Sequence, residues 1–284
     1  MSSKQQAVRA RPSAGWALLG SELSVLFRRW RTWAMLAALA AIPVLIALAV
    51  RLSSRDPGPG QGPPFLDRVT QNGLFIALTA TVVSIPLFLP LTISVVAGDA
   101  IAGEANLGTL RYLLAAPAGR IRLLAVKYAA AVAFCITAAL TVVTAGMLIG
   151  VALFPVGPVT LLSGDTISVG ESVLRLLLIA GYVSLSLAGL AAIGLFISTL
   201  TEVPVGAMAA TAVLAVVAQI LGALPQLDWL HPWLFTHHWV GFADLLRQPI
   251  SWDAFAANAL LQGGYIALFC TLAYGRFASK DVLS

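Results

Sequence analysis

Six long apolar runs are the feature that most constrains this 284-residue chain. A helix needs about 20 consecutive apolar residues to cross a bilayer, and backbone groups in lipid must be bonded within their own segment, which favours α-helices. The runs are Trp33–Val50, Gly73–Val96, Tyr128–Phe154, Val173–Ser198, Val203–Ala223 and Phe255–Tyr274. The sequence therefore predicts an all-α integral membrane protein with six transmembrane helices in one domain, residues 1–284.

The distribution of charge predicts how the chain is oriented. Only 10% of residues are charged, against about a quarter in soluble domains. With the N-terminus inside, most of the 17 Lys and Arg residues fall in inner segments, as the positive-inside rule requires. We therefore expect a multi-pass protein of the bacterial plasma (inner) membrane with both termini in the cytoplasm. The basic surplus suits anionic lipid and needs no nucleic-acid partner.

The sequence lacks several residue patterns that ion-coupled carriers, ATP-binding proteins and enzymes require. No ionisable side chain lies in the middle of any run, whereas proton and ion relays depend on such groups. No Gly-x-x-x-x-Gly-Lys-Ser/Thr loop or Ser-His-Asp set occurs either. His231, His237 and His238 have no acidic or Cys ligand at useful spacing, so no metal site is expected. An ion-coupled carrier and an enzyme are both disfavoured.

A polar, glycine-broken island, residues 98–122, separates the second and third runs. Its pattern is Glu104, Gly108-Thr109-Leu110, Leu113-Leu114, Pro117, Arg120 and finally Lys127. This pattern resembles the cytoplasmic coupling segment of the ABC-2 family of transporter permeases, also called type V exporters. The layout of the rest of the chain is similar to that family as well.

The resemblance implies a permease subunit without its own ATPase site and without a bound cofactor. ATP and Mg would be bound by separate ABC ATPase subunits, and a second permease, identical or related, would complete the transporter in the lipid bilayer. Residues Ala102–Leu114 would form a short helix in a groove of the ATPase. Glu104 and Arg111 would make polar contacts there, Gly108 would permit close approach, and Pro117 would end the helix.

Residues 14–31 predict an amphipathic helix ahead of the first span. Trp16, Leu19 and Leu23 recur at helical spacing, which is typical of a helix that lies in the membrane interface. The segment resembles the elbow helix of ABC-2 permeases, which would add an ATPase contact through Arg28 and Arg29. The alternative is a basic, aromatic anchor with no further role.

Three other segments carry structural expectations. Pro86 and Pro90 should kink the second span, and hydroxyls such as Thr81 and Ser84 can bond the freed carbonyls. This kinked stretch is either a wall of the substrate path or a packing feature. Residues 225–253 are rich in Trp and His, which suit the membrane–water boundary, and the segment resembles the outer re-entrant helical hairpin of ABC-2 exporters. Gly146 and Gly150 suit close helix packing.

The sequence favours export of an amphipathic or lipophilic compound, such as a drug or lipid, because the spans offer no charged pocket. Within the same class, a specialised ion-extrusion or metalloenzyme-maturation system is the alternative. A non-transport membrane scaffold subunit is an alternative from another class. An ATPase partner would favour either transport function over the scaffold.

Overall fold

The computed structural model describes residues 13–53, 72–109, 119–160 and 165–279, and it is almost entirely helical. The helices are α1 (Ser13–Arg28), α2 (Trp30–Ser53), α4 (Leu74–Ser84), α5 (Phe88–Asn106), α7 (Arg120–Leu153), α8 (Val169–Leu200), α9 (Pro204–Gly222) and α10 (Asp253–Ser279). The short strands β1 (Val159–Thr160) and β2 (Thr166–Ile167) pair antiparallel.

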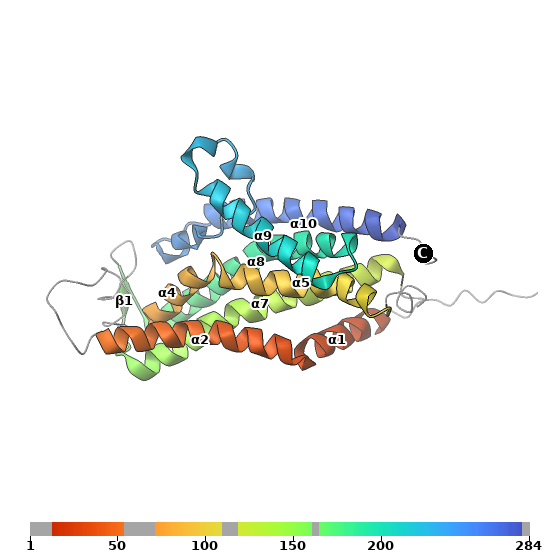
Figure 1. Ribbon diagram of the computed structural model, residues 1–284. Coiled ribbons are helices and arrows are strands. Elements are labelled where there is room, and N and C mark those ends of the chain that lie inside the picture. Colours follow the sequence, from red (N-terminus) through yellow and green to blue (C-terminus); the bar gives the residue numbers. More distant parts are fainter. Residues whose placement is uncertain (1–12, 54–71, 110–118, 161–164, 280–284) are drawn as a thin grey trace, which may run out of the picture.

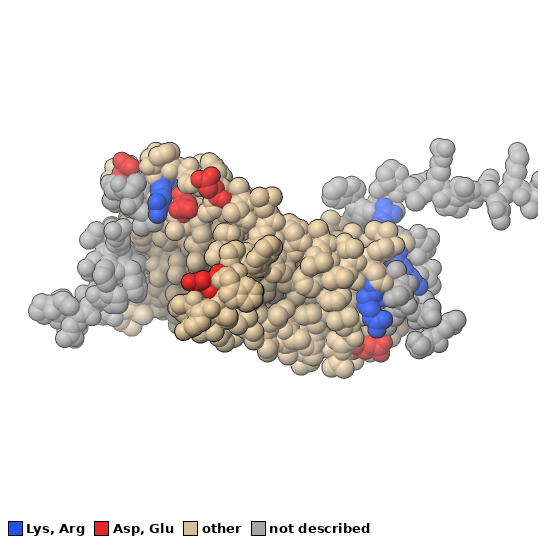
Figure 2. Space-filling view, turned by 90° about the horizontal axis from the view of Figure 1, so that it is seen from above, with Lys and Arg blue, Asp and Glu red and all other residues tan. Residues whose placement is uncertain are grey.

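Six of these helices, α2, α5, α7, α8, α9 and α10, are long and apolar enough to cross a membrane. The chain is therefore an all-α integral membrane protein. Five predicted spans match α2, α7, α8, α9 and α10, whereas the second, Gly73–Val96, is divided between the shorter α4 and the span-length α5. Figure 1 shows the helices side by side in one bundle, with α1 at one extremity and β1 at the other. We call these the α1 end and the β1 end. Charged side chains gather towards both ends, and a broad uncharged band lies between them (Figure 2).

Helix α1 confirms the predicted helix before the first span. The helical structure breaks at Arg29, where two side chains of α2 bond the last carbonyls of α1. Thr32 Oγ1 donates to the Leu26 carbonyl at 2.6 Å, and Trp33 Nε1 donates to the Phe27 carbonyl at 2.7 Å. These bonds satisfy carbonyls that a helix end otherwise leaves unpaired, so the bend is fixed by the first turn of α2.

The second predicted span is two helices rather than one kinked rod. Helix α4 ends at Ser84, and α5 begins at Phe88. Pro86 lies in the break, and Pro90 lies in the first turn of α5, where a missing N–H costs least. Gln219 of α9 donates from Nε2 to the Pro86 carbonyl at 2.6 Å, so a neighbouring helix supplies the bond that the break removes.

Helix α7 is longer than a bilayer requires. Its 34 residues span about 51 Å at 1.5 Å per residue, against a hydrocarbon core of about 30 Å. The predicted role of Gly146 and Gly150 is confirmed within the chain. A Cβ on Gly146 would lie 2.5 Å from the Ala77 Cα, and one on Gly150 would lie 2.1 Å from the Gly73 carbonyl oxygen. Helices α4 and α7 therefore pack backbone to backbone.

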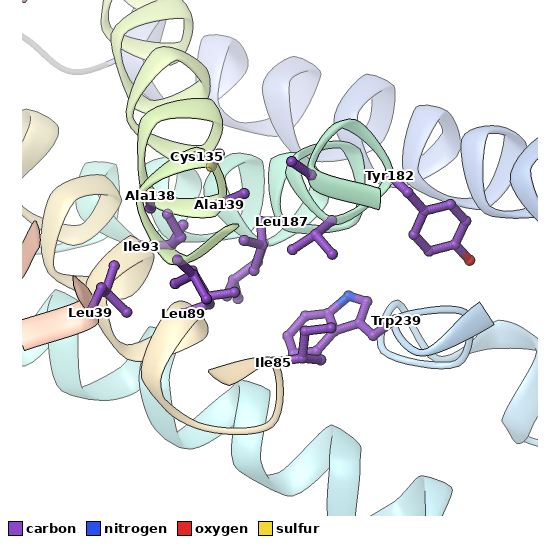
Figure 3. Packing of buried hydrophobic residues seen from close by; sticks show 14 of the residues in the cluster. Leu39, Ile85, Leu89, Ile93, Cys135, Ala138, Ala139, Tyr182, Leu187 and Trp239 are labelled. Carbon is purple, nitrogen blue, oxygen red and sulfur yellow. The ribbon is translucent and has the colours of Figure 1, made fainter. Parts of the chain in front are cut away.

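Helix α8 lies at the centre of the bundle and is the most buried of the six spans. Its partners are α5, α7, α9 and α10. In Figure 3, Leu187 of α8 faces Ile93 of α5 and Ala139 of α7, and the Tyr182 ring points away from this group. By contrast, α9 and α10 are mostly exposed, as Leu260 illustrates at 80% exposure.

The predicted outer hairpin consists of short 3₁₀ helices, and its re-entrant placement in the membrane stays a prediction. Residues 225–253 contain three short 3₁₀ helices, η1 (Pro225–Leu227), η2 (His231–Trp233) and η3 (Gly241–Leu246). Prolines begin η1 and fall in η2, and a proline cannot supply the N–H that would extend a preceding helix. Buried Arg175 of α8 fastens the segment by donating to the Leu245 and Arg247 carbonyls, both at 2.8 Å.

Candidate functional site

The end of α5 explains why Glu104, Gly108 and Thr109 occur together. The Thr109 N–H bonds the Glu104 carbonyl at 3.1 Å, and the Gly108 N–H bonds the Ala105 carbonyl at 3.0 Å. These two bonds define a Schellman motif, in which the residue after the helix adopts positive φ and is usually glycine. Gly108 has φ +69°. The three residues therefore form a helix stop.

One expectation for this segment is corrected by that stop. A continuous helix over Ala102–Leu114 is wrong, because α5 ends at Asn106. The positive φ of Gly108 gives this position a reason of its own to be glycine, and the close approach of an ATPase at Gly108 stays a prediction. Arg111 and Pro117 lie outside the described residues.

Lys127 of α7 joins two other helices at the α1 end. Its Nζ lies 2.9 Å from Glu22 Oε1 of α1 and 3.0 Å from Glu104 Oε1 of α5. The lysine side chain is 7% exposed, and the two carboxylates are 22% and 19% exposed. The second carboxylate oxygen of Glu104 accepts from Thr109 Oγ1 at 2.5 Å. Glu104 is thus fully engaged within its own chain.

A second ion group lies beside the first. Asp99 of α5 accepts from Arg29 at 2.8 Å and from Arg31 at 2.5 Å. Both groups line one cleft of about 50 Å³ between α1, α5 and α7. Three cations face three anions there, so the charges balance. The small volume and the balanced charge suit a joint between helices better than a pocket for a charged ligand.

The remaining predicted contact residues have different surroundings. Arg120 Nη1 donates to the Phe277 carbonyl at 3.2 Å, which ties the start of α7 to the end of α10. Arg28 ends α1 and is exposed. Trp16 belongs to α1, but its side chain lies outside the described residues. Contacts between these residues and an ATPase stay a prediction.

The residues predicted for a substrate path are mostly buried within the chain. Thr81 and Ser84 are 2% and 0% exposed, and their hydroxyls donate to carbonyls of their own helix, at 2.8 Å and 2.6 Å. Pro90 is also buried, whereas Pro86 is exposed. The surface of this stretch is formed instead by apolar side chains, among them Val82, Val83, Leu87 and Leu91. The path itself stays a prediction.

Sequence reasoning missed several polar residues that the fold brings together. Glu22 and Asp99 looked like ordinary polar residues, because nothing in their local sequence indicates their partners. Asn258 and Gln262 of α10 are 0% exposed, and the amide of Gln262 donates to the Phe235 carbonyl at 2.8 Å. Their spacing of four residues inside an apolar run was the available signal. Among the described residues, no three His, Cys, Asp or Glu side chains could hold a metal ion.

Fold and site together define a multi-pass helical membrane protein with a charge-balanced joint at one end of its bundle. Comparison with known families makes this specific: the model of the ABC-2 family transporter proteins matches residues 16–238. The chain belongs to this family and is a membrane permease of an ABC transporter, the transport subunit that works with an ABC ATPase. No curated protein matches the chain.

Proposed function

We propose that this permease serves an ATP-driven exporter, which moves an amphipathic or lipophilic compound, such as a drug or lipid, outward across a bacterial plasma membrane. The α1 end then faces the cytoplasm, where both termini lie. A separate chain binds ATP and Mg²⁺ and docks against that end. A second permease, identical or related, completes the transporter.

The bridge through Lys127 is the observation that carries this proposal. An ATPase beneath the membrane can act on a permease only through elements at the cytoplasmic end. Helix α1 and the end of α5 are two such elements, and Lys127 connects both to the long helix α7 through Glu22 and Glu104. Separating the partners of such partly buried ion pairs is costly, because it leaves a charge without its counter-charge. Movement imposed on one element is thereby passed to the other two.

The positions of the cations support the proposed orientation. The described cations at the α1 end are Arg28, Arg29, Arg31, Arg120, Arg122, Lys127 and Arg276. Those towards the β1 end are Arg51, Arg175 and Arg247. Because Lys and Arg concentrate on the cytoplasmic side of membrane proteins, this surplus supports a cytoplasmic α1 end.

The chemistry of the bundle supports a lipophilic substrate. The band between the two charged ends carries no charged side chain in Figure 2. The amide nitrogens of the buried Asn258 and Gln262 donate to Ser186 and to the Phe235 carbonyl of the same chain. A compound with a large apolar part could follow such surfaces, whereas a small ion would lose its hydration without replacement.

Purification of the complex from its native membrane tests the proposal. We expect an ATP-binding subunit to co-purify with vanadate-sensitive ATPase activity. Glu104→Ala should lower that activity relative to the amount of permease without reducing membrane insertion, because it releases the end of α5 from Lys127. Asp253→Ala, which removes an exposed carboxylate at the start of α10, is the control and should leave activity unchanged.

Other outcomes would favour other functions. A permease that purifies alone in several mild detergents would refute the exporter and favour the membrane scaffold. Uptake of a fluorescent lipophilic dye into inside-out vesicles tests direction, since an exporter loads such vesicles only when ATP is supplied outside. Transport that continues without ATP and stops when an ion gradient is collapsed would indicate an ion-coupled carrier.

A further inference from the structure

Ser198, near the end of α8, makes an unusual set of bonds with α5. Its hydroxyl donates to the Gly98 carbonyl at 2.7 Å and accepts from the N–H groups of Ile101 and Ala102 at 3.0 Å and 2.8 Å. The Gly98 carbonyl and the Ala102 N–H are the pair that an α-helix normally joins to each other. A side chain of α8 thus bonds both members of one rung of α5.

Close packing surrounds this contact. A Cβ on Gly98 would lie 2.7 Å from the Met208 nitrogen of α9, and one on Gly194 of α8 would lie 2.7 Å from the Ala97 Cβ of α5. Ser198 is 0% exposed. The backbones of three helices therefore approach closely around one hydroxyl. Among the described residues, no other buried hydroxyl bonds two successive backbone amides of another helix.

The location gives the contact a mechanical consequence. Helix α5 is continuous through this rung. The contact lies just before the last turn of α5, which carries Glu104. On the other side, α8 runs to Arg175 and Tyr182, which hold the outer segment through the Leu245 carbonyl and the His238 carbonyl.

We propose that Ser198 is a positioning residue that links the end of α5 to α8, so that displacement of the end of α5 shifts α8 and the outer segment. This inference rests on the proposed function, because the displacement is that imposed by the ATPase. Helix α8 suits the role, since it is the most buried span and reaches from one end of the bundle to the other (Figure 1).

Hydrogen–deuterium exchange on the purified permease–ATPase complex tests the contact itself. Ser198→Ala should raise exchange in peptides covering residues 99–106 by about fivefold, the factor for one net hydrogen bond. Ser94→Ala is the matched control: Ser94 is 0% exposed and lies on α5, but its hydroxyl bonds only the Pro90 carbonyl of its own helix. Unchanged exchange at 99–106 in Ser198→Ala would overturn the proposal.

Vanadate trapping with ATP tests the coupling. In the wild-type complex, trapping should alter exchange at both residues 99–106 and residues 231–247. Ser198→Ala should keep the ATPase activity and the change at 99–106, yet lose most of the change at 231–247. Ser198→Cys replaces the hydroxyl by a thiol, a weaker hydrogen-bond donor. Its change in exchange at residues 231–247 should lie between those of the wild type and Ser198→Ala. This variant replaces Ser198→Ala in the test if the alanine variant does not fold.

The two proposals fail in different ways. If trapping alters exchange at 231–247 in Ser198→Ala as strongly as in the wild type, the role of Ser198 is refuted and the exporter stands. If trapping alters neither segment in the wild-type complex, the proposed function is refuted, and the inference with it.

Discussion

Lys127 has two carboxylate partners, and this redundancy predicts a non-additive response to mutation. Glu22→Gln or Glu104→Gln alone leaves the 7% exposed ammonium with one partner. The two carboxylate side chains are about a fifth exposed, so water weakens each ion pair. Each single change should therefore lower the free energy of unfolding by about 1 kcal/mol. The double variant leaves a buried ammonium unpaired, a state that costs about 3–5 kcal/mol. We therefore expect the double variant to lower the free energy of unfolding by at least about 3 kcal/mol, which is about 1 kcal/mol more than the sum of the two single changes.

Unfolding by SDS in mixed micelles, followed by tryptophan fluorescence, measures these differences. Arg28→Gln removes an exposed cation from the same end of the bundle and should stay within about 0.5 kcal/mol of the wild type. Lys127→Met strands two carboxylates and should cost at least as much as the double variant. Single effects that simply add, or a Lys127→Met variant no worse than either single change, would refute the shared-partner geometry.

Three other contacts give predictions of their own. Gly146→Ala places a Cβ 2.5 Å from the α4 backbone and should cost about 1–3 kcal/mol, whereas Gly263→Ala, in open space, should change stability by less than about 1 kcal/mol; the SDS titration compares them. Arg175→Met removes the hydrogen bonds from α8 to the Leu245 and Arg247 carbonyls, so limited proteolysis should cut residues 241–249 several-fold faster. Gln219→Leu leaves the Pro86 carbonyl without its donor, at a cost of about 1–3 kcal/mol, and amide exchange over residues 85–91 should rise.

The spans could be predicted from sequence because the bilayer itself sets the length and polarity of a crossing helix. Their ends and breaks depended on finer causes. Pro86 and Pro90 indicated a kink, but the chain breaks completely there, and Gln219 of α9 bonds the Pro86 carbonyl at the break. The outer segment was too long for a turn and too broken for a span, and its helical hairpin was implied only by the resemblance to ABC-2 permeases. Its prolines and its anchoring by Arg175 produce short 3₁₀ turns instead.

The candidate site was only partly accessible from sequence for a similar reason. Glu104, Gly108 and Thr109 are close in the chain, so their association was visible, although their role as a helix stop was not. Glu22 lies far from Glu104 in sequence, and only the packing of α1 and α5 against α7 brings both carboxylates to Lys127. Ser198 gave no sequence signal, because a serine near the end of an apolar run ordinarily bonds its own helix.

The excess length of α7 makes the surrounding lipid part of the joint. Because this helix spans about 51 Å, its start, with Lys127, lies near or beyond the edge of the hydrocarbon core. Longer acyl chains would cover more of the helix, withdraw water from the Glu22–Lys127–Glu104 group and strengthen its pairings, while shorter chains would hydrate and loosen them. Bilayer thickness therefore tunes how firmly α1 and α5 are held to α7, and reconstitution in lipids of graded chain length should vary the stiffness of that joint without any change in sequence.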